Sequence, residues 1–477
     1  MNNLSASPLN LPEVRDMVGK HLDRSDLARC LCVCRSWHAS FVPLVWSTAS
    51  ILPEPTHLNP SLEAFIRHCH HLKELSYTVD APREYRSTPC PKLSDLQVSV
   101  TQPPANPPPN DTVVIDIPQH EQLRTLRIKG AEMGPSLRII WKPAHHLHNL
   151  SGLSLSNLEI EPQDTTTFWD LCTQLEVLQT ANVSVELPVQ SITFDRLMCL
   201  GLNLSLKPRN SLERQLDFII QCPNLTLLHW INLDGELASR YTGRFKPGTC
   251  AWPNLREFSL IGPGFSDEQL AQIIGAMRDL KTLEIIGCEV GLSFLAALRP
   301  HFPSLRSLDI SDANALTPTI TSHILASCSD LESLVVGHCM SQDIIDGPPW
   351  ICENSLKELT AAFMFPLGDA AVHHQRQVLQ RISRLTNLKK VTLSQAYDID
   401  ACYLDLRLEN GLELLATWKN LEKLSFYAGF HHVSARDVEW MIDNWKNLKE
   451  VDGYFNQRNR DELIAMFRAA GVKCRIF

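Results

Sequence analysis

Residues 280–285 read Leu-Lys-Thr-Leu-Glu-Ile, and residues 305–310 read Leu-Arg-Ser-Leu-Asp-Ile. The shared phrase is a leucine, a second leucine three residues later, and an apolar residue five residues after the first. It recurs along most of the chain, at spacings of 21 to 33 residues that average about 27, which indicates a stacked, repetitive fold. The fifteen phrases start at Leu72, Leu93, Leu123, Leu150, Leu175, Leu197, Leu225, Leu255, Leu280, Leu305, Leu331, Leu356, Leu388, Leu421 and Leu448.

Side-chain direction explains the phrase. Successive side chains of a strand point to opposite faces, so the third and fifth residues after each start point one way, and the second, fourth and sixth point the other. The third place is a leucine in twelve phrases and Phe258, Val391 or Val451 in the others. The fifth place is apolar with two clear exceptions, Thr180 and Gly453. Because one such strand cannot bury its apolar side alone, we expect the strands to stack in parallel over a common core.

Several segments between the phrases carry helical signals. Ser266 with Gln269 forms a capping-box pattern, and apolar residues follow at helical spacing. Ser434 is placed as the N-cap of a helix through Val438, and Gly471 as the stop of a third. A strand, a loop and a helix within about 27 residues resemble the unit of leucine-rich-repeat proteins. The resemblance covers about 400 residues and implies an α/β solenoid, a horseshoe with parallel β-strands inside and helices outside.

Composition narrows the class of protein. The 477 residues carry a net charge of −9 and contain 44% hydrophobic and 20% charged residues, as folded proteins do. No long basic run appears, which argues against nucleic acid as the main partner. The start of the chain lacks the pattern of a secretion signal, and no apolar run approaches the roughly 18 residues of a membrane span. We expect a cytoplasmic or nuclear protein that does not enter a membrane.

The fifteen cysteines follow the repeat rather than a metal or disulfide pattern. Cys69, Cys222 and Cys328 each lie three residues before a repeat leucine, and Cys288 and Cys339 each lie eight residues after one. A residue type fixed to repeat register is used for packing, as a small buried hydrophobe. The His and Cys run at 68–71, the cysteines at 30–34 and the histidines at 145–148 lack a second ligand pair at zinc-like spacing, so we predict no metal and no other cofactor.

The first fifty residues do not carry the repeat. Pro12 suits the first turn of a helix that continues through Val14, Val18 and Leu22. Ser25 is the expected N-cap of a second helix bearing Leu27, Leu31 and Cys34. A third helix through Trp37 and Phe41 should stop near Pro43. We expect three short helices over 11–50, a tail at 1–10, a linker and solenoid entry over 51–71, and the repeat domain over 72–477. A further proline-rich segment, Thr101 to Pro118, should be an exposed loop, with a proline-directed recognition site as the alternative.

This stretch resembles an F-box. The elements of that family appear in order as 11–14 (Leu-Pro-Glu-Val), 26–27 (Asp-Leu), 33–37 (Val-Cys-Arg-Ser-Trp) and 43–46 (Pro-Leu-Val-Trp). One departure is that Glu13 follows Pro12 directly, without the common intervening residue. An F-box followed by leucine-rich repeats is similar to the substrate receptors of SCF-type, cullin–RING ubiquitin ligases, particularly their fungal forms. That resemblance implies docking on a Skp-type adaptor, and through it on a cullin–RING scaffold.

The resemblance also implies which residues would contact the adaptor. They are Leu11, Pro12, Val14, Val18, Leu22, Leu27, Val33, Trp37 and Trp46. Trp37 and Trp46 have a second interpretation as core aromatics of the helical module. A receptor of this type performs no chemistry itself, and the chain shows no nucleophile elbow, phosphate-binding glycine loop or other catalytic motif. We therefore expect a non-catalytic protein.

A target protein should bind the open face of the strands. The candidate substrate-binding residues are Glu358, Lys390, Lys423, Tyr427, Glu450, Asp452 and Tyr454, with a second, apolar patch at Leu227, His229, Ile231 and Ile286. The alternative is a solvated sheet face without a partner. For the whole chain, the alternative to a ligase receptor is a repeat scaffold whose N-terminal helices only cap the solenoid.

Overall fold

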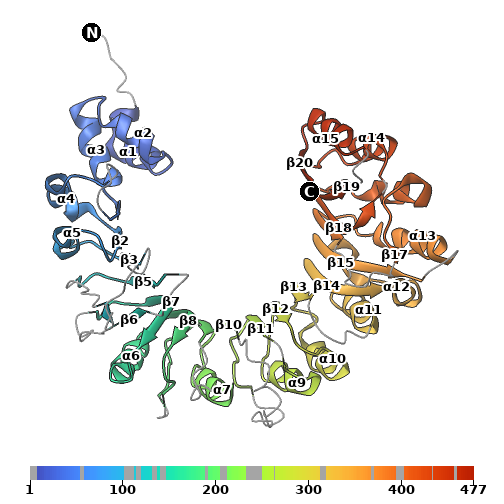
Figure 1. Ribbon diagram of the computed structural model, residues 1–477, viewed down its shortest axis with the longest axis horizontal. Coiled ribbons are helices and arrows are strands. Elements are labelled where there is room, and N and C mark those ends of the chain that lie inside the picture. Colours follow the sequence, from blue (N-terminus) through green and yellow to red (C-terminus); the bar gives the residue numbers. More distant parts are fainter. Residues whose placement is uncertain are drawn as a thin grey trace. The chain divides into compact units, whose positions relative to one another are not determined.

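A computed structural model describes most of the chain and divides it into two compact units, residues 1–222 and 223–477. In each unit the strands form one layer and the helices lie along one face of that layer (Figure 1). The described residues are 8–53, 59–100, 112–113, 120–131, 137–139, 147–188, 192–204, 212–231, 250–262, 264–311, 318–366, 370–393, 402–431, 433–455 and 459–476.

The first unit begins with a short 3₁₀ turn, η1 (Pro8–Asn10), and three helices, here called the helical module: α1 (Pro12–Gly19), α2 (Arg24–Cys30) and α3 (Arg35–Val45). Strands and helices then alternate. They are β1 (Thr48–Ile51), α4 (Leu62–His68), η2 (Cys69–His71), β2 (Glu74–Thr78), α5 (Arg83–Ser87), β3 (Asp95–Ser99), β4 (Thr112–Val113), β5 (Thr125–Lys129), β6 (Leu137–Ile139), β7 (Gly152–Ile160), α6 (Thr165–Cys172), β8 (Val177–Ser184), β9 (Cys199–Asn203) and α7 (Leu212–Ile220).

The second unit repeats the same alternation. Its elements are β10 (Leu227–Ile231), β11 (Glu257–Ile261), α9 (Asp267–Gly275), β12 (Thr282–Ile286), α10 (Leu292–Leu298), η3 (Arg299–His301), β13 (Ser307–Ile310), α11 (Pro318–Ser327), β14 (Ser333–Met340), α12 (Ser341–Asp346), η4 (Ile351–Asn354), β15 (Glu358–Phe365), α13 (Ala370–Ile382), β16 (Lys390–Leu393), β17 (Cys402–Tyr403), η5 (Leu408–Asn410), η6 (Leu412–Thr417), β18 (Lys423–His431), α14 (Ala435–Asn444), β19 (Glu450–Phe455), α15 (Arg460–Ala469) and β20 (Lys473–Ile476).

The strands stack in parallel and in the register that the phrase predicts. In the first unit the order is β1-β2-β3-β5-β7-β8-β9, and a second short row, β4-β6, continues onto the far half of β7. In the second unit the described strands follow the order β10 to β16, then β18, β19 and β20, and β17 pairs antiparallel with β15. Each unit is therefore a leucine-rich-repeat solenoid of the α/β class.

The predicted core is confirmed at every phrase. All fifteen starting leucines, and the residues three and five places after each, are buried. The two polar or small exceptions have local explanations. The hydroxyl of Thr180 donates to the Gly201 carbonyl at 3.1 Å and accepts from the Asn203 N–H at 3.1 Å, so it is buried with partners. Gly453 lies against the buried ring of Phe426, its register partner on β18, where a side chain would not fit.

Two strands at the ends carry the same pattern without a starting leucine. In β1, Ala49 and Ile51 are buried and pair with Leu75 and Tyr77, which places Trp46 where the other repeats have leucine. In β20, Cys474 pairs with Val451, which places Gly471 at the start. The sheet thus begins at residue 48, so β1 lies at the junction where we had predicted the end of the helical module, and α4 and η2 lie within the predicted linker.

Helix boundaries follow local chemistry. The capping boxes at Ser266 and Ser434 are both present, and Gly471 follows Ala470, the C-cap of α15, with a positive φ of 79°. The predicted N-cap of α2 was wrong: the side chain of Asp23, not Ser25, accepts the Asp26 N–H at 2.8 Å, because a carboxylate two residues earlier reaches the free N–H groups of the first turn.

The predicted end of the third helix near Pro43 is confirmed to within two residues: α3 ends at Val45, and the Trp46 N–H donates to the Val42 carbonyl. The predicted extent of the second helix was wrong. It was expected to bear Leu31 and Cys34, but α2 ends at Cys30, so the cysteines at 30–34 do not share one helix. Cys30 ends α2, Cys32 lies in a turn, and Cys34 is the N-cap of α3.

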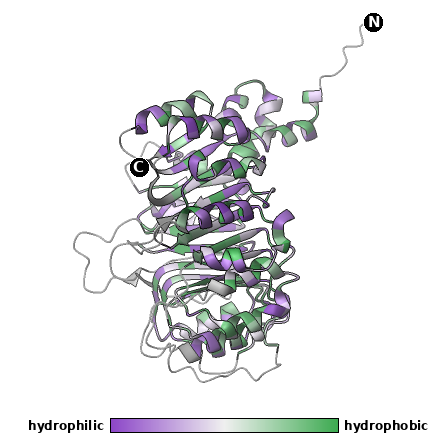
Figure 2. Ribbon diagram, turned by 90° about the vertical axis from the view of Figure 1, so that its right-hand side faces the viewer, coloured by the Kyte–Doolittle hydropathy of each residue, from purple (hydrophilic) through white to green (hydrophobic). Residues whose placement is uncertain are grey.

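Figure 2 shows helices whose ribbons carry both hydrophilic and hydrophobic residues, as expected for helices that cover a core on one side. None of the helices in the described part of the chain combines the length and the apolar character that crossing a membrane requires. Of the proline-rich segment predicted as a loop, only β4 belongs to the described residues.

Candidate functional site

The core of the helical module is small. Leu27, Phe41 and Val42 are buried, and α1 approaches α3 at Gly19. A Cβ on Gly19 would lie 2.4 Å from Leu44 Cδ1 and 2.8 Å from Phe41 Cε1, so the close packing of these two helices requires a residue without a side chain. So small a core leaves much of the module's apolar surface outside it.

The surface of the module is rich in exposed apolar side chains. Five of the twelve large apolar side chains that are exposed among the described residues belong to it. We call these five the apolar surface of the module: Leu9 (39% exposed), Leu11 (55%), Met17 (58%), Val18 (40%) and Val33 (60%). Leu11, Val14 and Val18 lie at i, i+3 and i+7, on one side of α1. An exposed concentration of this kind is typical of a surface that binds another protein.

Two residues of the apolar surface, Leu9 and Met17, were not among the predicted docking residues, although Met17 adjoins Val18 in the sequence.

The predicted docking residues fall into three groups according to their exposure. Leu27 contributes to the module core, and Leu22 lies just after α1. Among the seven aliphatic and proline positions, Leu11, Pro12, Val18 and Val33 are exposed, Val14 and Leu22 are half-buried, and Leu27 is buried.

The two tryptophans are both half-buried. Trp37 packs edge-on against Phe41, with ring centroids 5.5 Å apart, on the inner side of α3. Trp46 stacks on His68 of α4 at 4.9 Å. Both contacts agree with the interpretation of these residues as packing aromatics, and neither side chain is fully covered.

The module is joined directly to the first repeat. The Ser47 carbonyl accepts the N–H groups of Lys73 and Glu74 at 2.8 and 3.0 Å. Burial and the neighbouring cations lower the pKa of His68, which keeps its imidazole neutral against Trp46. A neutral, stacked His68 and two main-chain hydrogen bonds fix the module to the repeats within this unit.

Local contacts occupy the histidine run beside this junction. The rings of His70 and His71 contact each other at a tilt of 47°, with centroids 3.9 Å apart, and the Cys69 thiol donates to the Ile66 carbonyl at 3.1 Å. No set of three or more His, Cys, Asp or Glu side chains could hold a metal ion among the residues that the structure describes. His145 and His146 of the third run lie outside those residues.

The open face of the second unit carries a ladder of charges. The Lys390 Nζ lies 2.6 Å from Glu358 on the neighbouring strand, and the Lys423 Nζ lies 2.7 Å from Asp452 and 3.3 Å from Glu450. The hydrogen bond to Asp452, followed by the one to Glu450, raises the pKa of Lys423 despite its partial desolvation. Five of the seven predicted substrate-binding residues thus neutralise one another across adjacent strands.

This pairing changes what the predicted target site offers. Asp452, expected to be exposed, is buried, since Lys423 covers one of its oxygens; the other oxygen, Oδ1, has no hydrogen-bond partner. Tyr427 and Tyr454 lie in β18 and β19, and their side chains fall outside the described residues. The second predicted patch is half-buried at all four positions, Leu227, His229, Ile231 and Ile286.

The cysteines in repeat register pack as predicted in most places. Cys222, Cys288, Cys328 and Cys339 are buried, whereas Cys69 is only half-buried. Burial raises the pKa of Cys288, Cys328 and Cys339 to about 12, so these thiols stay protonated. The thiol of Cys288 donates to the Gly262 carbonyl at 3.2 Å. These residues fill the core between strands and helices.

A hollow of about 240 Å³ lies on the open face of the first unit, which the sequence did not single out. It is bounded by Arg24 of α2 and by residues of β1, β2, β3 and β5. The signal that could have found it is the short polar side chains of Ser50 and Ser76 at outward positions of neighbouring strands.

Comparisons with known proteins bear on the fold alone. No family model matches the chain, and no curated protein matches it. Two similar solved structures are the yeast Rad7 in complex with Elc1, at 14% identity, and TLR13 in complex with ssRNA13, at 12% identity. The first match covers 94% of this chain and 90% of the other, with a TM-score of 0.34. The second covers 91% of this chain but only 65% of the other, with a TM-score of 0.36.

Proposed function

We propose that the chain is a substrate receptor of an SCF-type ubiquitin ligase. The helical module docks on a Skp-type adaptor, which links it to a cullin–RING scaffold, and the open face of the repeats binds the target protein. The observation that carries this proposal is the apolar surface of the module, on helices whose sequence resembles an F-box. Its five side chains face water in the isolated chain, and covering them with a partner gains about 25 cal/mol for each Å² of apolar area buried.

The receptor itself performs no chemistry in this proposal. It raises the local concentration of the target beside a conjugating enzyme, and the rate gain comes from proximity. A firm connection between module and repeats serves that task, because it restricts where the bound target lies. The Ser47 hydrogen bonds and the stack of Trp46 on His68 supply such a connection in the first unit.

The test is co-expression of the chain with a Skp-type adaptor, followed by size-exclusion chromatography. Leu11→Asp and Val33→Asp place a charge at exposed positions that the module core does not use, so the fold should survive and co-elution should be lost. Val372→Asp is the matched control, since Val372 is 54% exposed but lies on α13. It should co-elute as the unchanged protein does.

Point variants are better than deletion of residues 1–50, because that deletion would also remove most of β1. The proposal fails if the unchanged chain does not bind the adaptor, or if the Val372 variant loses binding as much as the Leu11 and Val33 variants.

A second function is favoured by one observation. Since β1 follows α3 after two residues and pairs with β2, the helical module leads directly into the first strand of the solenoid. A non-ubiquitin scaffold whose helices only cap the repeats would ignore the adaptor. In that case Leu11→Asp and Val33→Asp would leave every partner interaction unchanged, whereas loss of the module would lower solubility.

A further inference from the structure

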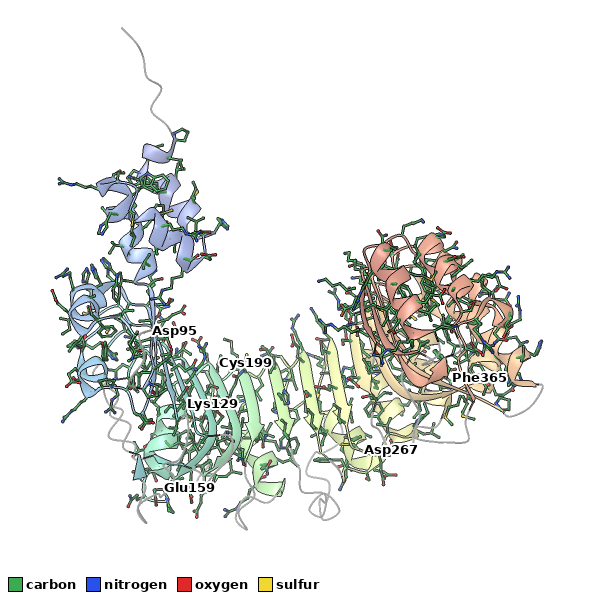
Figure 3. The ribbon with its side chains drawn as sticks, turned by 45° about the horizontal axis from the view of Figure 1, so that its top comes forward. Asp95, Lys129, Glu159, Cys199, Asp267 and Phe365 are labelled. Atoms are coloured by element: carbon green, nitrogen blue, oxygen red, sulfur yellow. The ribbon has the colours of Figure 1, made fainter. Side chains whose placement is uncertain are left out.

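The hollow on the open face of the first unit has a floor of short side chains. Thr48, Ser50 and Ser76 lie on β1 and β2, and their small size leaves the space. Arg24, at the start of α2, forms the wall on the side of the helical module. Figure 3 shows Asp95 on the strand layer close to that module. The hollow therefore joins the F-box-like helices and the first repeats in one site.

Four charged side chains line the hollow. Glu74 and Asp95 are register partners on β2 and β3, so two carboxylates occupy adjacent strands roughly 4.8 Å apart. Arg127 lies on β5, two residues further along the strand direction, and Arg24 faces the sheet from α2. Like charges on neighbouring strands repel each other, and no intervening cation relieves Glu74 and Asp95.

These charges are held apart, unlike those of the second unit. Glu358 and Lys390 pair directly across strands there. In the hollow the one polar contact of a charged group is the Ser94 hydroxyl, which donates to Asp95 at 2.7 Å. Within the described part of the chain, Arg24, Glu74 and Arg127 form no ion pair. The hollow thus presents two neighbouring carboxylates, on β2 and β3, and two arginines, one from α2 and one from β5.

We propose that this hollow binds a peptide segment of the target that carries a basic residue and an acidic residue. The basic residue contacts Glu74 and Asp95, and the acidic residue contacts Arg127 and Arg24. Charge complementarity to the four side chains is the basis of the assignment. That the peptide belongs to a protein destined for ubiquitination rests on the proposed function, whereas peptide binding itself does not.

A peptide fits better than a free small molecule. Small-molecule sites enclose most of their ligand, but Arg24, Glu74 and Arg127 are all exposed, and the sheet face continues beyond the hollow. Along and across the strands, the backbone position of Arg127 lies about 8 Å from that of Asp95 and about 12 Å from that of Glu74. An extended peptide covers that distance in roughly two to four residues. The spacing of the opposite charges in the ligand is therefore a quantitative expectation.

The experiment uses the full chain and synthetic fluorescent peptides with capped ends. Each peptide has two arginines and two aspartates, separated by zero to eight glycine or serine residues, and binding is followed by anisotropy at low ionic strength. We expect the tightest binding at spacers of one to three residues, because a spacer of that length places the inner charges two to four positions apart. Glu74→Gln with Asp95→Asn, and separately Arg24→Gln with Arg127→Gln, should each weaken it by about tenfold.

The matched control is Glu358→Gln with Lys390→Gln, which removes an open-face charge pair of the second unit and should leave binding unchanged. Three results would overturn the proposal: no peptide of the series binds, the control weakens binding as much as the hollow variants do, or all-basic peptides, all-acidic peptides or a single-stranded oligonucleotide bind as well. Circular dichroism checks the fold, and retained co-elution of each variant with the adaptor separates failure here from failure of the proposed function.

Discussion

Substitution of Gly453 by alanine should destabilise the C-terminal end of the second unit. Gly453 lies in β19 with a φ of 147°, a conformation that side chains disfavour. It also replaces the apolar residue that every other repeat except the one with Thr180 has at this place, and it lies opposite Phe426. A Cβ would lie 2.1 Å from the Phe426 carbonyl oxygen and 2.8 Å from its ring atom Cδ2. Real Cβ contacts essentially never fall below 3.0 Å, so the backbones of β18 and β19 must separate by about 1 Å.

The magnitude follows from two contributions. The positive φ costs an alanine about 1–2 kcal/mol. Separating the strands weakens the neighbouring backbone hydrogen bonds, each worth about 1 kcal/mol net, and disturbs the packing of the buried Phe426 ring. The expected loss is about 3–5 kcal/mol, which is large for a single methyl group.

Hydrogen exchange is the appropriate assay, because repeat proteins open locally from their ends rather than in one step. Protection should fall over residues 423–476 and stay unchanged in the first repeats of the unit. Gly471→Ala is the control for backbone strain alone: its φ is 79° but nothing lies within 4 Å of the new Cβ, so it should cost about 1–2 kcal/mol. Gly275→Ala, with open space and an ordinary φ, should be neutral or slightly stabilising. Equal protection in the Gly453 and Gly471 variants would refute the steric argument.

Three other predictions concern buried polar groups. Thr180→Val removes two hydrogen bonds and should lower the free energy of unfolding, measured by urea titration, by about 1–3 kcal/mol. Thr180→Ser keeps the hydroxyl and should lower the free energy of unfolding by less. Equal losses in the two variants would contradict the hydrogen-bond explanation. Near pH 8 a thiol reagent should modify the exposed Cys32 rapidly and Cys288 only after unfolding, because burial raises the pKa of Cys288 to about 12. Rapid labelling of Cys288 in the folded chain would refute this prediction. Burial lowers the pKa of His301 below 6.5, so the unfolded chain binds more protons than the folded chain as the pH falls through 6.5, and the free energy of unfolding should decrease over that range. His301→Gln should flatten this decrease between about pH 7.5 and pH 5.5. An unchanged slope in the variant would count against the role of His301.

Local pattern was sufficient for the solenoid. Period-2 alternation inside each phrase dictates which side chains face the core, and the spacing of the phrases dictates that the strands stack in parallel. The buried positions at Leu283 and Ile285 could therefore be predicted from the sequence, as could the caps at Ser266 and Ser434, which depend on residues three positions apart. The end strands escaped prediction because Trp46 and Gly471 replace the starting leucine.

The candidate sites depended on contacts between strands that are distant in sequence. The outward charges Lys423 and Asp452 looked available to a target, yet in the fold they neutralise each other, because neighbouring strands bring them within 2.7 Å. Among the residues that the structure describes, Glu74 and Arg127 have no ion-pair partner, although both line one hollow with Asp95 and Arg24. The sequence by itself determined the repeat, its inward faces and the point near residue 50 before which the repeat is absent. Only the tertiary structure decided which surface side chains are paired, covered or left free, since that depends on the distances between strands and helices rather than on the order of residues along any one of them.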